Sequence, residues 1–239
     1  MANSGERSLD DIRLLDDLPA EALRKLEGQC RWREYQPNEK IIDRFSDDRD
    51  VFFVVGGAVQ ILNYSYSGRE IAFARIRAGG YFGELAAIDG APRSATVMAL
   101  DKSLLAAMEP ACFNQLLSEE AMIAKRIIER MARIIRRCDD RIMDLSTLGA
   151  VQRVYLELLR LALLDAATST NWVIWPIPTQ ATIAGRASTS RETVARAMGQ
   201  LAGDNVIERK HKTLYIRDRN RLEQLAAVFD PDWGEEKVR

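Results

Sequence analysis

Residues 82–96 read FGELAAIDGAPRSAT, and this stretch decides how the rest of the chain is interpreted. Glu84 stands in a run of small residues where a short helical turn can begin, and Arg93 follows a Gly90-x-Pro92 turn. A carboxylate accepts a hydrogen bond from a hydroxyl group, whereas an Arg fork suits an anionic phosphate, particularly beside backbone N–H groups at a helix start. The pair predicts a pocket for a ligand that carries both groups. The alternative is a surface Glu84–Arg93 salt bridge over a turn.

The same stretch resembles a known motif. Phe-Gly-Glu-Leu-Ala…Pro-Arg-Ser-Ala-Thr-Val is similar to the phosphate-binding cassette of cyclic-nucleotide-binding domains. This cassette occurs in the cyclic-AMP receptor protein / fumarate-nitrate regulator family and in regulatory subunits of cyclic-AMP-dependent kinase, and the Glu84-to-Arg93 spacing resembles the kinase form. The resemblance implies that Glu84 holds the ribose 2′-hydroxyl and that Arg93 holds the cyclic phosphate. It also implies contributions from Ser94 and from backbone N–H groups near Gly83, Leu85 and Ala95.

The composition bounds the remaining possibilities. The chain has 239 residues and a net charge of −1, which leaves room for two modest domains and a connector. Three cysteines without paired spacing argue against a disulfide framework or a zinc site and fit a cytoplasmic protein. No apolar run reaches membrane-spanning length, and the N-terminus lacks a secretory apolar core. An iron–sulfur or haem sensor needs a Cys cluster or an axial ligand, and an enzyme needs a nucleophile–base pair, so we expect neither a metal nor catalytic residues.

The pattern along residues 9–108 predicts a β-rich domain. Residues 9–26 are typical of short helices, and short apolar or β-branched runs separated by turn residues follow from residue 32 to residue 108. The predicted strands are 41–42, 51–55, 59–62, 71–76, 95–99 and 103–107. Many short strands at regular spacing indicate a barrel or a double-layered, jelly-roll-like β-roll, and the family has such a roll. We therefore expect an α+β protein.

A long helix follows from about Pro110. Between residues 121 and 145 apolar residues keep a seven-residue repeat, with Ala121, Ile128, Ile135 and Ile142 at one position and Ala124, Met131, Cys138 and Leu145 at the other. Such a repeat favours a two-stranded parallel coiled coil, and the family dimerises through a long helix at this place, so we predict a homodimer. The alternative is a helix packed on the core of its own domain. At Cys138, on this seam, a small buried side chain is expected rather than a redox switch.

Residues 179–201 are typical of a helix-turn-helix. Thr179 and Ser190 are good N-caps for the two helices, and Val194, Ala197, Met198 and Leu201 form an apolar stripe on the second. The opposite face presents Arg191, Glu192 and Arg196. An Arg fork bonds guanine and a Glu accepts from cytosine, so this face predicts base contacts in a major groove. The alternative is an ordinary solvated charged face.

Thr-Ser-Arg-Glu-Thr-Val-Ala-Arg is similar to the recognition helix of the cyclic-AMP receptor protein family. The resemblance implies base contacts by Arg191, Glu192 and Arg196 and phosphate contacts by Thr179 and Thr193, with Ser190 at the helix start. Ser188, where the family often has Gly, and Gly185 depart from the pattern. Residues 206–208 and 213–216 predict a hairpin like the wing of a winged helix. Its basic tip, residues 209–212 with Lys210 and Lys212, would meet backbone phosphate, and the alternative is a solvated turn.

The resemblance covers nearly the whole chain. It predicts a cyclic-nucleotide-binding roll with N-terminal helices (residues 1–109), a dimerisation helix and hinge (110–147) and a winged helix-turn-helix domain (148–239). An ungapped carry-over places Cys138 and Asp139 against the nucleotide base, where the receptor protein has Thr and Ser. Asp139 could accept from adenine and Ser94 could reach guanine, so cAMP is favoured and cGMP is the alternative.

The resemblance also has consequences for partners. We expect a bacterial cytoplasmic transcription factor that binds double-stranded DNA at a near-palindromic site. A hinge at residues 145–149 would reorient the recognition helices when the ligand binds. RNA polymerase is an expected partner, and the loop 166–171 lies where the family often touches it. The alternatives are a family member that responds to another ligand, and a regulatory subunit of an enzyme or channel, which the helix-turn-helix disfavours.

Overall fold

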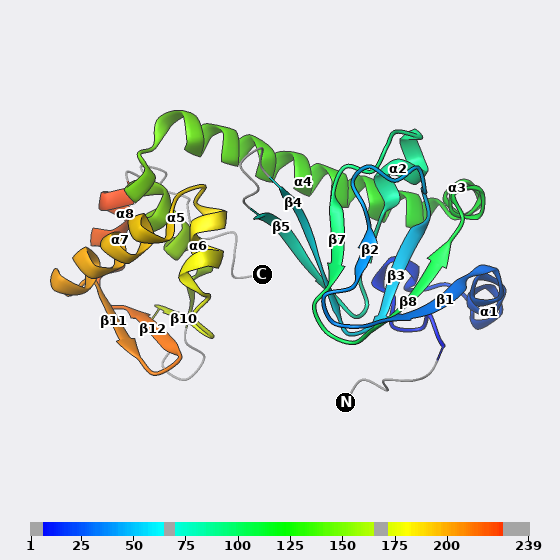
Figure 1. The fold of residues 1–239 in the computed structure, drawn as a ribbon, viewed down its shortest axis with the longest axis horizontal. Coiled ribbons are helices and arrows are strands. Elements are labelled where there is room, and N and C mark those ends of the chain that lie inside the picture. Colours follow the sequence, from blue (N-terminus) through cyan, green and yellow to red (C-terminus); the bar gives the residue numbers. More distant parts are fainter. Residues whose placement is uncertain (1–6, 65–69, 165–171, 227–239) are drawn as a thin grey trace. The chain divides into compact units, whose positions relative to one another are not determined.

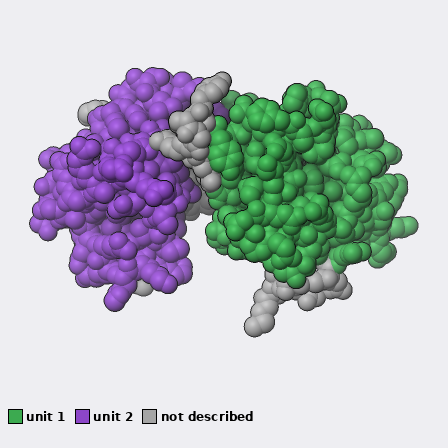
Figure 2. All heavy atoms as spheres, in the orientation of Figure 1, with its two compact units in different colours: residues 1–135 green, residues 136–239 purple. Residues whose placement is uncertain are grey.

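The computed structural model describes residues 7–64, 70–164 and 172–226. The chain divides into two compact units, residues 1–135 and residues 136–239 (Figure 2). The domain boundaries predicted from the sequence, after residues 109 and 147, stay predictions. In the described residues no helix has both the length and the apolar character that crossing a membrane requires.

The first unit is a β-roll of two four-stranded antiparallel sheets, as the sequence predicts (Figure 1). One sheet has the order β1-β8-β3-β6 and the other the order β2-β7-β4-β5. The strands are β1 (Arg31–Tyr35), β2 (Lys40–Ile42), β3 (Val51–Gly56), β4 (Ala58–Tyr64), β5 (Glu70–Arg77), β6 (Tyr81–Phe82), β7 (Thr96–Ala99) and β8 (Ser103–Met108). The helical elements are a 3-10 turn (Arg13–Leu15), α1 (Ala20–Gln29), α2 (Glu84–Asp89) and α3 (Pro110–Glu119).

Strand β3 shows why the run at residues 51–55 is apolar without alternation. Side chains of a strand alternate between its faces, and both faces of β3 are covered. Val51 and Phe53 pack against the N-terminal and following helices, whereas Phe52 and Val54 pack between the two sheets. Strands β1 and β6 were not predicted as separate runs. β1 carries charged residues with only Tyr35 buried, and β6 has two residues, so neither has a clear apolar pattern.

The long helix predicted from about Pro110 is in fact two helices, because α3 ends at Glu119 and α4 (Ala121–Thr147) begins after Glu120. The residues of α4 belong to both units. Ile123 and Ile127, outside the predicted repeat, are buried against the roll, and Met131 packs partly against the same core. Other members of the predicted repeat are exposed: Ile128 at 67%, Ile135 at 60%, Ile142 at 61%, and Cys138 as well. The helix therefore has one apolar face on its own core and a second one directed outward in the single chain.

The second unit packs three helices and a small sheet around α5. Its elements are α5 (Ala150–Leu161), β9 (Leu163–Leu164), β10 (Trp172–Ile174), α6 (Gln180–Arg186), α7 (Arg191–Gly203), β11 (Ile207–Lys210), β12 (Thr213–Ile216) and α8 (Arg219–Ala226). The sheet has the order β11-β12-β10-β9. Leu158, Ile183, Val194 and Leu201 lie in one core, so the amphipathic stripes of α5, α6 and α7 face each other.

Some predicted boundaries shift. β11 runs to Lys210, so only His211 and Lys212 form the turn of the hairpin, with His211 at φ 53°. Helix α7 extends to Gly203, and Asn205 takes the left-handed conformation of the following turn at φ 58°. The predicted polymerase loop, residues 166–171, and the end of the last predicted helix, residues 227–229, lie outside the described residues.

Candidate ligand pocket and nucleic-acid interface

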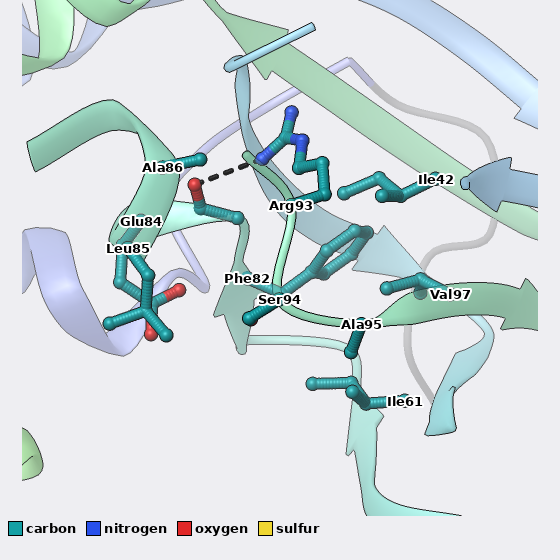
Figure 3. A pocket seen from close by; sticks show the side chains of 11 residues that line it. Ile42, Ile61, Phe82, Glu84, Leu85, Ala86, Arg93, Ser94, Ala95 and Val97 are labelled. Carbon is teal, nitrogen blue, oxygen red and sulfur yellow. Dashed lines mark hydrogen bonds between the residues drawn. The ribbon is translucent and has the colours of Figure 1, made fainter. Parts of the chain in front are cut away.

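A pocket opens in the β-roll beside α2 (Figure 3). It encloses about 410 Å³ of space not filled by protein atoms, a volume that includes open solvent at its mouth. The residues that line it are Ile42, Ile61, Phe82, Gly83, Glu84, Leu85, Ala86, Arg93, Ser94, Ala95 and Val97. Mostly apolar walls with one buried acid and one buried base match the chemistry of a ligand with an apolar ring and polar ends.

Gly83 allows the wall of this pocket to form. It is the N-cap of α2 and has φ 88°, in the left-handed region that favours glycine. A Cβ atom at this position would lie 2.6 Å from the carbonyl oxygen of Asp50 and 2.8 Å from Nη1 of Arg93. Glycine is therefore required both by the backbone conformation and by the close approach of Arg93.

Arg93 is the buried cation of the pocket, with 4% of its surface exposed. Nη1 donates to the carbonyl of Gly83 (3.0 Å), and Nη2 donates to the carbonyl of Asp50 (2.8 Å) and to the carboxylate of Asp48. The guanidinium carbon lies 5.9 Å from the ring centre of Phe52, which stacks on Phe82 at 5.1 Å. The buried Nε has no hydrogen-bond partner in the described part of the chain, so it remains able to donate to a ligand.

Glu84 is equally buried, at 5% exposure, but it does not pair with Arg93. Its carboxylate lies 3.7 Å from Nη2 of Arg130 on α4, and Figure 3 shows it pointing away from the Arg93 guanidinium. Arg130 also donates to the carbonyl of Tyr81 (3.0 Å) and lies 4.1 Å above its ring. The alternative of a surface Glu84–Arg93 salt bridge is wrong, because both groups are buried and each has another partner.

Burial raises the pKa values of two groups that lie near Glu84 and Arg93, the Tyr81 hydroxyl and the Asp50 carboxyl. The pKa of Tyr81 is raised chiefly by burial, although the Arg130 guanidinium opposes the shift. The pKa of the Asp50 carboxyl is likewise raised chiefly by burial, with Arg31 acting in the opposite direction. Both residues contact the pocket residues or their partners, Tyr81 through Arg130 and Asp50 through its carbonyl with Arg93, and in such partly buried surroundings charged contacts are stronger than on the surface.

The pocket brings together six predicted ligand residues: Gly83, Glu84, Leu85, Arg93, Ser94 and Ala95. Cys138 and Asp139 are not among its lining residues. Both are exposed on α4 and belong to the second unit. In the described residues no group of three or more His, Cys, Asp or Glu side chains could hold a metal ion.

The second candidate site is α7. Val194, Ala197 and Leu201 are buried, as predicted, and Arg191, Glu192 and Arg196 are exposed on the other side. Among the described residues neither Arg191 nor Arg196 has an ion-pair partner, so both guanidinium groups are available to a ligand. Hydrogen bonds from the Glu192 backbone and from the Ser190 side chain lower the pKa of Glu192 and keep it an acceptor.

The two predicted helix caps are confirmed. The Thr179 hydroxyl accepts from the backbone N–H of Thr182 (3.1 Å), and the Ser190 hydroxyl accepts from that of Thr193 (3.2 Å). Each cap satisfies a backbone donor that the first helical turn leaves unpaired. Both residues are exposed, and so their hydroxyl groups can still meet solvent or phosphate.

Two arginines hold the turn between α6 and α7. Ser188 has φ 49°, a left-handed conformation that explains why glycine suits this position. Arg141 of α4 donates to the Ser188 hydroxyl (2.8 Å) and to the carbonyl of Gly185 (3.2 Å). Arg153 of α5 donates to the carbonyls of Ala187 (2.9 Å) and Ser188 (3.2 Å). These bonds offset the backbone cost of a residue other than glycine.

At the hairpin, Lys210 pairs with Glu208 at 3.1 Å, and Glu208 also pairs with Arg217 at 2.6 Å. The pKa of Glu208 is lowered by Arg217 first and by Lys210 second. Lys212 is exposed in the turn, with no ion-pair partner in the described ranges. Lys212 is therefore the less neutralised of the two predicted phosphate-binding lysines.

Comparisons with known proteins identify the two domains in which the candidate sites lie. Residues 32–120 match the cyclic nucleotide-binding domain, and residues 152–225 match the Crp-like helix-turn-helix domain. The cAMP-activated global transcriptional regulator Vfr of Pseudomonas aeruginosa is 30% identical over 201 residues, which are 81% of this chain and 92% of Vfr. The chain belongs to the CRP/FNR family of transcription regulators.

Other members agree in sequence and fold. The cAMP-activated regulator CRP of Salmonella typhimurium is 28% identical over 191 residues, covering 79% of this chain and 90% of CRP. A CooA mutant from Carboxydothermus hydrogenoformans has the same fold, with a TM-score of 0.72 at 18% identity over 90% of this chain and 99% of CooA. Because it has both a cyclic nucleotide-binding domain and a Crp-like helix-turn-helix domain, this chain is a cyclic-nucleotide-binding transcription regulator. Regulators of the CRP/FNR family bind DNA as dimers, and the family is not one of enzymes.

Sequence reasoning missed several residues that shape the two sites of this CRP/FNR regulator. Asp48 binds Arg93, Arg130 binds Glu84, and Arg141 and Arg153 hold the helix-turn-helix turn. Asp48, Arg130 and Arg141 each have charged neighbours along the chain, and Arg153 is a single arginine in an amphipathic helix. Only the excess of arginine on α4 could have marked Arg130 and Arg141, and that excess is also typical of a solvated helix.

Proposed function

We propose that this protein is a cAMP-controlled homodimeric transcription factor that binds a near-palindromic DNA site and acts with RNA polymerase. The observation that carries the proposal is the buried guanidinium of Arg93. Its Nε has no partner among the residues that the structure describes, and Arg93 lines a pocket together with the buried Glu84. The relatives Vfr and CRP are cAMP-activated regulators, which supports cAMP as the ligand.

In this proposal the cyclic phosphate binds at Arg93. The phosphate carries one negative charge, so its oxygen would accept a strong, charge-assisted hydrogen bond from the buried guanidinium. Nε would donate to a phosphate oxygen while the bonds from Nη1 and Nη2 to the carbonyls of Gly83 and Asp50 persist. The Ser94 hydroxyl and the backbone N–H groups of Gly83, Leu85 and Ala95 would complete this subsite.

The ribose binds at Glu84. Its carboxylate has two oxygens and accepts several hydrogen bonds, so a 2′-hydroxyl can donate to it while Arg130 remains its counter-ion. This arrangement would connect the ribose directly to α4. A ligand shifts the equilibrium between two α4 arrangements only by the difference in its affinity for them, and this contact is one place where that difference would arise.

The base would contact Cys138 and Asp139 of the dimer helices. Asp139 would accept from the adenine amino group, whereas Ser94 would reach a guanine amino group if that base turned over the sugar. We therefore favour cAMP, with cGMP as the alternative ligand.

The DNA interface would consist of α7 and the hairpin. Arg191, Glu192 and Arg196 would contact base edges, and Thr179, Ser190, Thr193, Lys210 and Lys212 would contact the phosphate backbone. A two-fold axis along the outward face of α4 would set two recognition helices against successive major grooves, about 34 Å apart. A near-palindromic operator follows from that symmetry.

The test is calorimetric titration of the purified protein with cAMP and with cGMP. We expect Arg93→Ala to weaken binding about 100-fold and Glu84→Gln about tenfold, because hydrogen bonds to charged groups contribute about 1.5–3 kcal/mol each. Arg75→Ala is the matched control, since Arg75 lies in the same unit but forms an exposed pair with Asp101. No binding of either nucleotide to the unaltered protein would overturn the proposal, and the ratio of the two affinities would settle the base preference.

A further inference from the structure

Asp48 forms an ion pair with Arg93, the arginine that would also bind the phosphate of the ligand. It lies in the loop between β2 and β3, and its carboxylate pairs with Nη2 of Arg93. The Arg93 side chain is 3% exposed, whereas that of Asp48 is 43% exposed. The pair therefore joins a fixed, buried cation to an anion with access to solvent.

Arg93 does not depend on Asp48 for its position. Nη1 is held by the carbonyl of Gly83 at 3.0 Å and Nη2 by the carbonyl of Asp50 at 2.8 Å. The ring of Phe52 lies 5.9 Å from the guanidinium carbon. These partners carry no net charge, so they orient the guanidinium without neutralising it. What Asp48 adds is the neutralisation of that charge.

We infer that Asp48 is a specificity-determining residue, an internal counter-ion that makes the pocket select a singly charged cyclic phosphate over a doubly charged open one. The inference rests on the proposed function. A phosphate at Nε shares one guanidinium with Asp48, and like charges at close range repel. The repulsion grows with the charge on the ligand. A cyclic phosphodiester carries one negative charge, whereas a phosphate monoester such as that of 5′-AMP carries about 1.5–2 at pH 7.

The exposure of Asp48 limits the size of this effect. A carboxylate that reaches water is screened by solvent and salt, and exposed pairs contribute little to stability. We therefore expect Asp48 to weaken cAMP binding about three- to tenfold rather than to abolish it. Because Asp48 is exposed, its carboxylate can also turn into solvent when the ligand enters. Arg93 would still be held by the carbonyls of Gly83 and Asp50.

The experiment compares the full-length protein with Asp48→Asn by competition against a fluorescent cyclic-nucleotide analogue. The asparagine keeps the size and an oxygen acceptor for Nη2 while it removes the charge. We expect cAMP to bind about three- to tenfold tighter, and 5′-AMP to gain by a larger factor, so that selectivity for the cyclic form falls. The gain should shrink between about 0.05 M and 0.5 M salt, because screening weakens the repulsion.

Asp47→Asn is the matched control, since it removes the neighbouring exposed carboxylate, which has no ion pair with Arg93 in the described part of the chain. Asp48→Ala is measured beside it so that the conclusion does not depend on how asparagine packs. Equal or weaker cAMP binding by both Asp48 variants, with binding by the unaltered protein intact, would overturn the role of Asp48 alone. Failure of the unaltered protein to bind any nucleotide would instead overturn the proposed function.

Discussion

The carboxylate of Glu84 lies 3.7 Å from the guanidinium of Arg130, which connects the ligand pocket to the first half of α4. Arg130 reaches the same region twice more, through the carbonyl of Tyr81 at 3.0 Å and its ring at 4.1 Å. A helix whose outward face is the candidate dimer surface therefore has a direct polar contact with the pocket.

We predict that Arg130→Ala destabilises the protein by about 1–3 kcal/mol, because it leaves a buried carboxylate without its counter-ion. Chemical denaturation of the unliganded protein measures the effect. Arg133→Ala, three residues further along and exposed, should change stability by less than about 0.5 kcal/mol. The double variant Arg130→Ala/Glu84→Gln should recover most of the stability lost in Arg130→Ala, because its buried side chain is no longer charged. If it does not, the unpaired Glu84 carboxylate is not the cause of the loss.

Gly83→Ala should disrupt the pocket. The added Cβ would stand 2.6 Å from the Asp50 carbonyl and 2.8 Å from Nη1 of Arg93, on a backbone at φ 88°. We expect a loss of about 1–3 kcal/mol of stability and weaker nucleotide binding, measured by thermal unfolding and calorimetry. The control is Gly28→Ala in α1, where no atom of the described residues lies within 4 Å of the added Cβ. Gly28→Ala should leave nucleotide binding unchanged and increase stability by about 0.5–1 kcal/mol. If Gly83→Ala binds nucleotide as tightly as the unaltered protein, the packing argument is wrong.

Ile135→Glu should dissociate the dimer. Ile135 is 60% exposed on the outward face of α4 in the single chain, and a charge there would be buried at a coiled-coil seam. Sedimentation velocity should show the change from dimer to monomer, together with weaker DNA binding. Arg136→Glu, on the same helix but outside the predicted repeat, should remain dimeric. A dimeric Ile135→Glu protein would place the interface elsewhere.

The recognition helix and the hairpin should respond differently to mutation. Arg196→Ala is expected to cost about 1–3 kcal/mol of affinity for the specific operator and to relax specificity at one position, because it removes a base contact. Lys212→Ala should weaken binding to all sequences alike and reduce the slope of log affinity against log salt by about 1. Fluorescence anisotropy over a salt series, with operator and random duplexes, separates the two. Equal effects of Arg196→Ala on both duplexes would remove it from the base-reading set.

Much of this architecture could be predicted from the sequence. The short strands, the long helix and the capped helix-turn-helix follow from local periodicity and cap residues, which act within a few positions along the chain. The same holds for the exposed face of α7, because helical spacing alone separates Arg191 and Arg196 from Val194 and Leu201. Strands β1 and β6 escaped because a charged edge strand and a two-residue strand have no clear local pattern.

The sequence by itself therefore determined the order of the elements, the two motifs and the presence of an acid and a base in one cassette. Only the tertiary structure decided which partners those groups have. Asp48 is 45 residues from Arg93, Arg130 is 49 residues from the Tyr81 carbonyl that it binds, and Arg141 is 47 residues from Ser188. Contacts across such separations depend on how sheets and helices pack, and a surface arginine or aspartate has the same local pattern with or without them. Packing of the roll is what buries Glu84 and Arg93 apart from each other and makes each of them available to a ligand.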